Sequence, residues 1–169
     1  MLRGDLIMTG SGPAVMNPSA FLERPESEEM ETRFGRVTVY PKQPIIFPNG
    51  MLGLPDKMQF CLTAFPSEKM GRFKLLQSLE DTNLSFITLP VDVQNPIVER
   101  PDMEIAARDL EIPLEHLAAL FIVSVHREEG VVKLSANARA PILMHALKRT
   151  ATQYVFHNAK YQIRQTLTL

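Results

Sequence analysis

The sequence predicts a mainly β protein: a small antiparallel β-barrel-like or strongly bent sheet with one short helical insert around residues 106–118. Most of the chain alternates apolar and polar residues with a period of two, which is typical of half-buried strands. The 13 prolines lie mostly between these alternating segments, where they suit loops. A bent or closed sheet also removes exposed strand edges, which otherwise favour aggregation.

Seven segments have the alternation and the β-branched and aromatic residues that fit a pleated sheet. In the first of them, Val37 and Val39 share one face, while Arg36 and Thr38 face the other way. The predicted strands are 34–40, 58–64, 73–79, 84–89, 121–125, 132–136 and 153–157.

Turn residues separate the predicted strands. The stretch FPNG at Phe47–Gly50 combines a proline of fixed φ with Asn-Gly, which tolerates a left-handed backbone. The stretch REEG at Arg127–Gly130 has the length of a hairpin loop, and its glycine can take a positive φ. Asp81–Asn83 is a third predicted turn.

One segment departs from the strand pattern. Ala106, Leu110, Leu114 and Leu117 recur at three- and four-residue spacing, which indicates a helix. Pro113 prevents one continuous helix, because it has no N–H and its ring clashes with the preceding turn. We therefore expect a short helix before Pro113 and a turn over 113–118.

The formal net charge of −1 conceals an uneven distribution. Residues 1–31 hold two basic and six acidic residues, a net charge of −4, and no sustained apolar period. We expect a flexible acidic N-terminal arm there. The remaining 16 basic and 13 acidic residues give residues 32–169 a net charge of +3, and we expect this part to form one β domain.

Composition excludes several classes of protein. A charged fraction of 22% and a near-neutral total argue against a disordered chain and a strongly basic nucleic-acid binder. The longest apolar-leaning run, 117–125, is half of the roughly 20 residues that span a bilayer. No basic region followed by an apolar run begins the chain, so we expect a soluble cytoplasmic protein without a membrane partner.

No group of residues predicts catalysis, a cofactor or a metal. Cys61 is the only cysteine and lies in an apolar predicted strand, as a small buried residue does. The four histidines are at least ten residues apart, unlike the four-residue spacing of a helical zinc site. Glycine-rich phosphate-binding motifs are also missing from the sequence. We expect a protein that is not an enzyme.

Two other classes stay open on the residues alone. One is a small barrel that holds a ligand, or an unrecognised enzyme, with a pocket that collects polar groups such as His126 or Cys61. The other is direct RNA binding by the basic segment 127–169, which contains seven basic, two acidic and three aromatic residues.

Three stretches in order resemble one family, the bacterial flagellar assembly factor FliW. The stretches are 33–62, 73–91 and 137–164, and they resemble the family's patterns I-x-FPxGxxGF, LQSxxDPxLAF and NLxAPIxxNxxxxxxxQxVxxxxxYxIR. The matching residues are Ile46, Phe47, Pro48, Gly50, Gly53, Leu76, Gln77, Ser78, Asp81, Leu84, Phe86, Asn137, Ala140, Pro141, Ile142, Gln153, Val155, Tyr161, Ile163 and Arg164. Leu54, Thr82 and His145 depart from the pattern, where an aromatic residue, Pro and Asn are usual.

The resemblance implies a cytoplasmic, non-enzymatic regulator with an antiparallel β fold. Members of the family bind the translational repressor CsrA and relieve its repression of flagellin mRNA. They also bind flagellin, in the manner of a chaperone, so that rising flagellin withdraws them from CsrA. We therefore expect CsrA and flagellin as partners, no direct contact with nucleic acid, no cofactor, and a monomer.

Eight polar residues are candidates for a protein-binding site. Five lie in or beside the resembling motifs, near predicted strand ends: Gln77, Ser78, Asp81, Asn137 and Arg139. The other three are Glu104, Asp109 and Glu111. They belong to the segment 99–115, which holds six acidic and two basic residues. An acidic surface there would attract basic patches of a partner.

Overall fold

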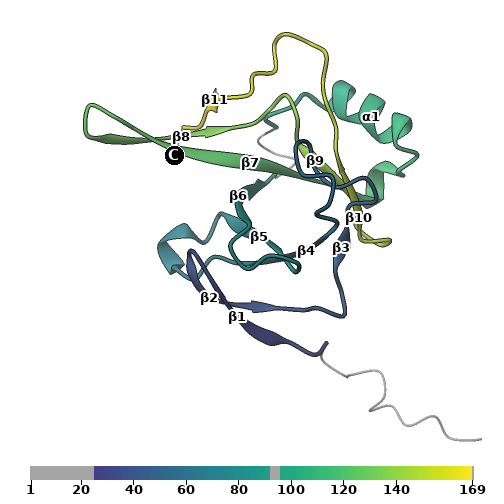
Figure 1. Cartoon of the computed structure of the whole chain (residues 1–169). Coiled ribbons are helices and arrows are strands. Elements are labelled where there is room, and N and C mark those ends of the chain that lie inside the picture. The colour runs from purple at the N-terminus through teal and green to yellow at the C-terminus, as the bar shows by residue number, and fades with distance from the viewer. Residues whose placement is uncertain (1–24, 92–95, 169) are drawn as a thin grey trace, which may run out of the picture.

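A computed structural model describes residues 25–91 and 96–168 of the chain. In those residues a nine-stranded sheet, a separate two-stranded sheet and one α-helix form (Figure 1). The elements are β1 (Glu28–Thr32), β2 (Gly35–Val39), β3 (Ile45–Ile46), β4 (Gln59–Ala64), the 3-10 helix η2 (Glu68–Met70), β5 (Lys74–Ser78), β6 (Ser85–Pro90), α1 (Arg100–Asp109), the 3-10 helix η3 (Leu114–His116), β7 (Leu117–Glu128), β8 (Val131–Ala136), β9 (Ile142–His145), β10 (Thr150–Gln153) and β11 (Gln165–Thr166). The predicted fold class, a mainly β chain with a strongly bent sheet and one helical insert, is confirmed.

Strand β7 organises the main sheet, because it pairs with three other strands. One edge of β7 pairs with β6, and the other edge is divided between β9 and β8. Between the pair Val123–Ala136 and the pair Leu120–Ile142, β7 advances by three residues, whereas the opposite chain advances by six residues from β8 into β9. The extra residues form a kink at Asn137–Pro141, where β8 ends and the chain turns into β9.

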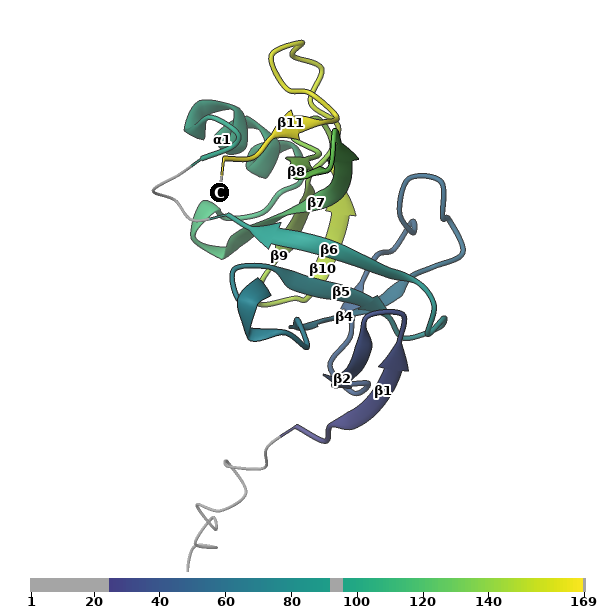
Figure 2. The same cartoon turned by 90° about the vertical axis from the view of Figure 1, so that its left-hand side faces the viewer.

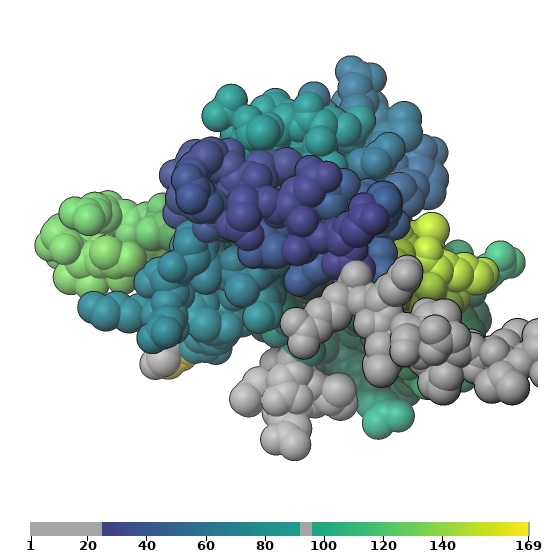
Figure 3. Space-filling model, turned by 90° about the horizontal axis from the view of Figure 1, so that it is seen from below, coloured from purple at the N-terminus to yellow at the C-terminus, as the bar shows by residue number. Residues whose placement is uncertain are grey.

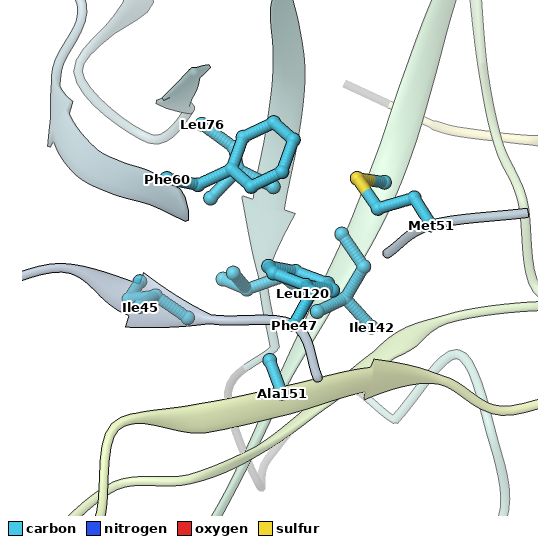
Figure 4. Close-up of a cluster of buried hydrophobic side chains, with 8 residues drawn as sticks. All are labelled: Ile45, Phe47, Met51, Phe60, Leu76, Leu120, Ile142 and Ala151. Carbon is cyan, nitrogen blue, oxygen red and sulfur yellow. The ribbon is translucent and has the colours of Figure 1, made fainter. Parts of the chain in front are cut away.

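The pairing of β7 with β9 closes the sheet into a ring, in the order β7-β6-β5-β4-β3-β10-β9. The sequence predicts a wholly antiparallel sheet, but the ring is mixed. The exception is β10, which pairs with β3 in parallel through Thr150 and Ile46. Buried side chains from six of these strands and the turn after β3 gather into one cluster (Figure 4). Its members are Ile45, Phe47, Met51, Phe60, Leu76, Leu120, Ile142 and Ala151, and Leu62 and Phe86 pack against them.

The β1–β2 hairpin lies across one face of the molecule (Figure 3). Val37 and Val39 of β2 pack with Cys61 and Leu75 of the main sheet in a small buried cluster. The Thr63 hydroxyl of β4 donates a hydrogen bond to the backbone carbonyl of Thr38, at 2.7 Å. The two-stranded sheet is therefore part of the folded body.

This hairpin corrects the predicted boundary of the arm at residue 31. Glu29 and Glu31 lie on β1 and accept hydrogen bonds from Thr38 and Arg36 of β2, at 2.8 and 2.7 Å. Charge composition placed these acids in the arm, although the exposed face of a strand can be equally acidic. Residues 1–24 of the expected arm lie outside the described residues.

Helix α1 and the β1–β2 hairpin lie at opposite ends of the molecule (Figure 2). Glu99 is the N-cap of α1, and Pro101 stands in the first turn, where its missing N–H costs no hydrogen bond. Ala106 and Ala107 form the buried side of the helix. Among the described residues, no helix has the length and the apolar character needed to cross a membrane.

The helical insert begins and ends earlier than the predicted 106–118. Proline in a first turn and Asp102 beside it are start signals that the apolar spacing alone does not contain. After the C-cap Leu110, Glu111 takes a left-handed φ of 54° and ends the helical path. The predicted turn at 113–118 contains η3, and β7 then starts at Leu117.

Six predicted strands overlap β2, β4, β5, β6, β7 and β8, and β7 extends beyond 121–125 at both ends. The predicted strand 153–157 is wrong, because β10 ends at Gln153. Beyond it, Tyr154 N–H donates to Pro141 O and Phe156 N–H to Arg139 O, at 2.9 and 2.8 Å. These acceptors belong to the Asn137–Pro141 kink, so no regular ladder forms. The short strands β1, β3, β9 and β11 were not predicted, and β10 shares only Gln153 with a predicted strand.

The three predicted turns are present. In the FPNG turn, Gly50 N–H donates to Phe47 O at 3.0 Å, and Gly50 has a φ of 66°. Glu129 and Gly130 both have positive φ, 51° and 81°, as the two central residues of a tight hairpin often do. Leu84 N–H closes the third turn on Asp81 O, at 3.0 Å.

We expect Gly50→Ala to destabilise the protein more than the matched variant Gly53→Ala. Both glycines have positive φ, so alanine costs about 1–2 kcal/mol at either position. A Cβ at Gly50 would also lie 2.6 Å from Pro55 Cα, whereas a Cβ at Gly53 meets nothing within 4 Å. Urea unfolding of both variants measures the difference, and equal losses would contradict the steric argument.

Candidate protein-binding surface

Three of the predicted binding residues, Glu104, Asp109 and Glu111, are exposed on α1 and directly after it. We call them the acidic α1 surface. Glu104 forms an ion pair with Arg100 one turn earlier, at 2.9 Å. Ion pairs of this spacing on an exposed helix contribute only a few tenths of a kcal/mol, so Glu104 stays available to a partner.

The C-terminal segment Tyr154–Arg164 fastens α1 to the sheet. Tyr161 is 3% exposed, its hydroxyl donates to Asp102, and the same oxygen accepts the Glu99 N–H at 3.0 Å. Lys160 Nζ lies 2.9 Å from the Glu99 carboxylate and 2.8 Å from that of Asp102. The acidic residues at the start of α1 are therefore held by side chains from the far end of the sequence.

These contacts change the pKa of the groups involved. The hydrogen bond from Lys160, followed by that from Tyr161, lowers the pKa of Asp102. The stability that Asp102 contributes is therefore present above about pH 3.9, the ordinary value for Asp, and is lost as the pH falls through the lowered pKa. At the other end of α1, the Tyr154 hydroxyl donates to Asp109 at 2.6 Å, which raises the pKa of Tyr154 to about 12.

A groove of about 310 Å³ lies beside the acidic α1 surface. One wall is the loop Leu110–Ile112, and the facing wall includes Leu143, His145 and Thr152 of β9 and β10. Glu111 lines this groove as well as belonging to the acidic α1 surface. The acidic side chains therefore continue into a partly apolar depression.

Gln77, a predicted binding residue, lies in the core of the fold. Its side chain is fully buried, and the two N–H groups of its amide are shared among the carbonyls of Ser78, Asp81, Thr82 and Leu84, which lie 2.9–3.4 Å from the nitrogen. Its amide oxygen accepts a hydrogen bond from the buried Ser85 hydroxyl. Gln77 therefore holds the β5–β6 turn together and offers no surface to a partner in this structure.

Ser78 and Asp81 complete the same turn. The fully buried Ser78 hydroxyl accepts the N–H groups of Glu80 and Asp81, both at 3.1 Å. The half-buried Asp81 carboxylate accepts the Asn83 N–H at 2.9 Å. Hydrogen bonds within the turn therefore account for the polar character that predicted an interface. Of the two residues, only Asp81 is partly exposed to a partner.

Asn137 and Arg139 are half-buried in the kink between β8 and β9. The Asn137 side-chain oxygen accepts the Ala140 N–H at 2.9 Å, as expected for a turn-forming Asn. Arg139 Nε donates to Tyr161 O at 3.1 Å. These two residues therefore connect the kink to the segment that fastens α1.

The structure does not gather the eight predicted residues into one site. The β5–β6 turn lies at one end of β6, and α1 lies beyond its other end (Figure 2). Sequence reasoning missed the supporting roles of Tyr154, Lys160 and Tyr161. The signal was present, since these aromatic and basic residues stand together in a segment that follows the acidic helix in the chain.

Metal-binding and thiol chemistry can be assessed in residues 25–91 and 96–168. There, no three His, Cys, Asp or Glu side chains are placed to hold a metal ion. Cys61 is 1% exposed, and burial raises the pKa of its thiol, which disfavours the reactive thiolate. We take the acidic α1 surface and its groove as the candidate functional site, because three predicted binding residues and a groove lie together there.

Comparisons with known proteins agree on one family. The family model described as FliW protein matches residues 28–167. The flagellar assembly factor FliW of Shouchella clausii is 29% identical over 142 residues, which cover 80% of this chain and 92% of that protein. Its counterpart in Leptospira interrogans is 28% identical over 144 residues, covering 82% and 92%. A crystal structure of the flagellar assembly factor FliW has the same fold, with a TM-score of 0.62, 22% identity, and coverage of 84% and 98%.

We expect Gln77→Met to lower the free energy of unfolding by about 1–3 kcal/mol, because it leaves buried groups of the β5–β6 turn without partners. The control is Gln59→Met on the exposed side of β4, which should change stability by less than about 0.5 kcal/mol. Chemical denaturation measures both. A Gln77→Met protein of unchanged stability would contradict the structural role.

Tyr161→Phe should loosen the start of α1, because it removes a buried donor to Asp102 and the acceptor of Glu99 N–H. We expect a loss of about 1–3 kcal/mol and faster hydrogen exchange of the amides in the first turns of α1. Tyr154→Phe is the matched control, since it removes one bond to the exposed Asp109 and should cost less. Equal effects of the two variants would contradict this account.

Proposed function

The chain belongs to the FliW family, and from that premise we propose that it is a flagellar assembly factor that acts by binding proteins, not as an enzyme. Its proposed partners are the translational regulator CsrA and flagellin. Binding to CsrA would relieve repression of flagellin mRNA, and rising flagellin would withdraw the protein from CsrA. We place this partner switch in the cytoplasm and assign the activity to a monomer.

The single observation that carries the proposed binding site is the acidic α1 surface beside a groove. Six acidic residues stand against two basic ones over residues 99–115, and Tyr154, Lys160 and Tyr161 hold the helix in place. A rigid surface loses little conformational freedom when a partner binds. An RNA-binding repressor must present basic groups, and these are complementary to this surface.

Direct RNA binding is the weaker alternative, because three of the seven basic side chains of residues 127–169 take part in contacts that hold the fold together. Lys160 lies within 2.9 Å of two acids of the α1 region. Arg139 and Arg149 donate to backbone carbonyls. Basic groups engaged in this way are less available to phosphates. A protein that shifts the mobility of RNA at low salt would reverse this preference.

A ligand-binding barrel is also less well supported than a protein-binding role. The cluster of buried side chains within the ring includes three fully buried aromatic and aliphatic residues, Phe47, Phe60 and Ile142. Phe47 and Phe60 pack edge to face, with ring centroids 5.1 Å apart (Figure 4). A barrel that holds a small molecule leaves this volume free instead.

The double variant Glu104→Lys, Glu111→Lys should weaken CsrA binding at least tenfold, about 1.4 kcal/mol, because it reverses two exposed charges of the acidic α1 surface. Calorimetric titration with purified CsrA measures the affinity, and the difference should shrink as salt is added. Asp109 is left unchanged because it accepts the Tyr154 hydroxyl, so its loss would also alter the helix contact.

The matched control is Glu68→Lys, Glu129→Lys, which reverses two exposed acids outside the α1 region. It should bind CsrA with wild-type affinity. Equal affinities for both double variants would remove the acidic α1 surface from the binding site. A competition titration with flagellin then tests the partner switch separately, since flagellin should displace CsrA from the wild-type protein.

A further inference from the structure

Two histidine rings stack at the turn between β9 and β10. His145 ends β9, and His116 ends η3, just before β7. Their ring centroids are 5.6 Å apart and their planes differ by 18°. Backbone contacts hold this arrangement, because Ala146 N–H donates to His116 O at 2.8 Å and β7 pairs with β9 from Leu117 to His145.

His145 also closes the turn with its own side chain. The residue is 6% exposed, and its Nδ1 accepts the N–H of Lys148 at 3.4 Å. His145 O accepts the N–H of Arg149 at 2.8 Å. An imidazole that accepts at Nδ1 must be unprotonated there, so the closed turn needs the neutral ring with its proton on Nε2.

The charges around His145 favour the neutral ring. Burial lowers the pKa of His145 most, followed by the positive charge of Lys148 in the same turn and by His116 from η3. Arg149 directs its guanidinium to the carbonyls of Gln43 and Pro44, at 2.6 and 3.3 Å. Glu111, which lines the groove from the loop after α1, is the acidic residue of that groove and is exposed to water.

We propose that the stacked His116 and His145 form an acid-sensitive latch on the β9–β10 turn. A proton from solvent on Nδ1 of His145 removes the acceptor of Lys148 N–H and places a positive ring beside Lys148 and His116. The turn then opens. Arg149 belongs to the turn, and its carbonyl accepts Ile46 N–H at 2.8 Å, so opening also loosens β3 and one wall of the groove.

The direction of the pH effect follows from proton binding. The open turn exposes His145, whose pKa then returns toward the ordinary value of about 6.5, so the open form takes up a proton more readily than the closed form. The closed form is therefore fully favoured above about pH 6.5 and loses that advantage as the pH falls toward the lowered pKa of the closed state.

Amide hydrogen exchange of the full chain, followed residue by residue by NMR, tests the latch without any partner. The measured quantity is the protection factor of the Lys148 amide, which removes the intrinsic pH dependence of exchange. Between about pH 7.5 and pH 5, we expect this protection factor to fall severalfold in the wild-type protein. The upper limit is about tenfold for each unit by which the pKa of His145 differs between the open and the closed form.

His145→Asn places its Oδ1 where Nδ1 of His145 lies, so it keeps an acceptor for Lys148 N–H but cannot titrate. The protection factor of the Lys148 amide should therefore not depend on pH in this variant. His116→Gln removes the stacked neighbour and should reduce the pH dependence, which keeps the test decisive if His145→Asn fails to fold. The control His157→Gln changes an exposed histidine and should behave as the wild type. A pH-independent wild type, or an unchanged response in His145→Asn or His116→Gln, would overturn the latch.

Discussion

The divided edge of β7 is the constraint on which the rest of the structure depends. One strand edge cannot bond two strands at the same residues, so β8 and β9 must share it and the chain must bend at Asn137–Pro141. The bend removes backbone groups from the ladder, and unpaired groups in a folded interior are costly. The C-terminal segment supplies their partners, with Tyr154 and Phe156 as donors and Gln162 O as the acceptor of two kink amides.

The same C-terminal segment connects the kink to α1. The Tyr161 carbonyl accepts a hydrogen bond from Arg139 Nε of the kink, and the Tyr161 hydroxyl donates one to Asp102 of α1. Phe156 and Tyr161 pack together, with ring centroids 5.1 Å apart, in the buried cluster that also receives Ala106 of the helix. The position of the acidic α1 surface is therefore a consequence of how the sheet divides, although kink and helix are far apart in the sequence.

Local patterns predicted the local elements, because a strand such as β4 or the FPNG turn depends mainly on adjacent residues. The kink could not be predicted in this way, since its cause is the competition of two strands for β7. Gln77 illustrates the same limit at the candidate site. Its polarity suggests the surface, but its carbonyl partners come together only when the β5–β6 turn has formed. Exposed acids such as Glu104 and Glu111 were recognisable, because the excess of acidic residues over 99–115 can be read directly from the sequence.

Electrostatic arguments for this protein must therefore be local. The chain total of −1 and the total of +3 for residues 32–169 both describe charges that do not act at one place. The six acidic residues of segment 99–115, together with the basic residues Arg100, Arg108 and Lys160, give the α1 region a net charge of −3. At physiological ionic strength, exposed charges separated by more than about 8 Å are largely screened. A partner that approaches α1 thus meets a locally acidic surface, and the contacts of Lys160 determine that field more than the total charge does.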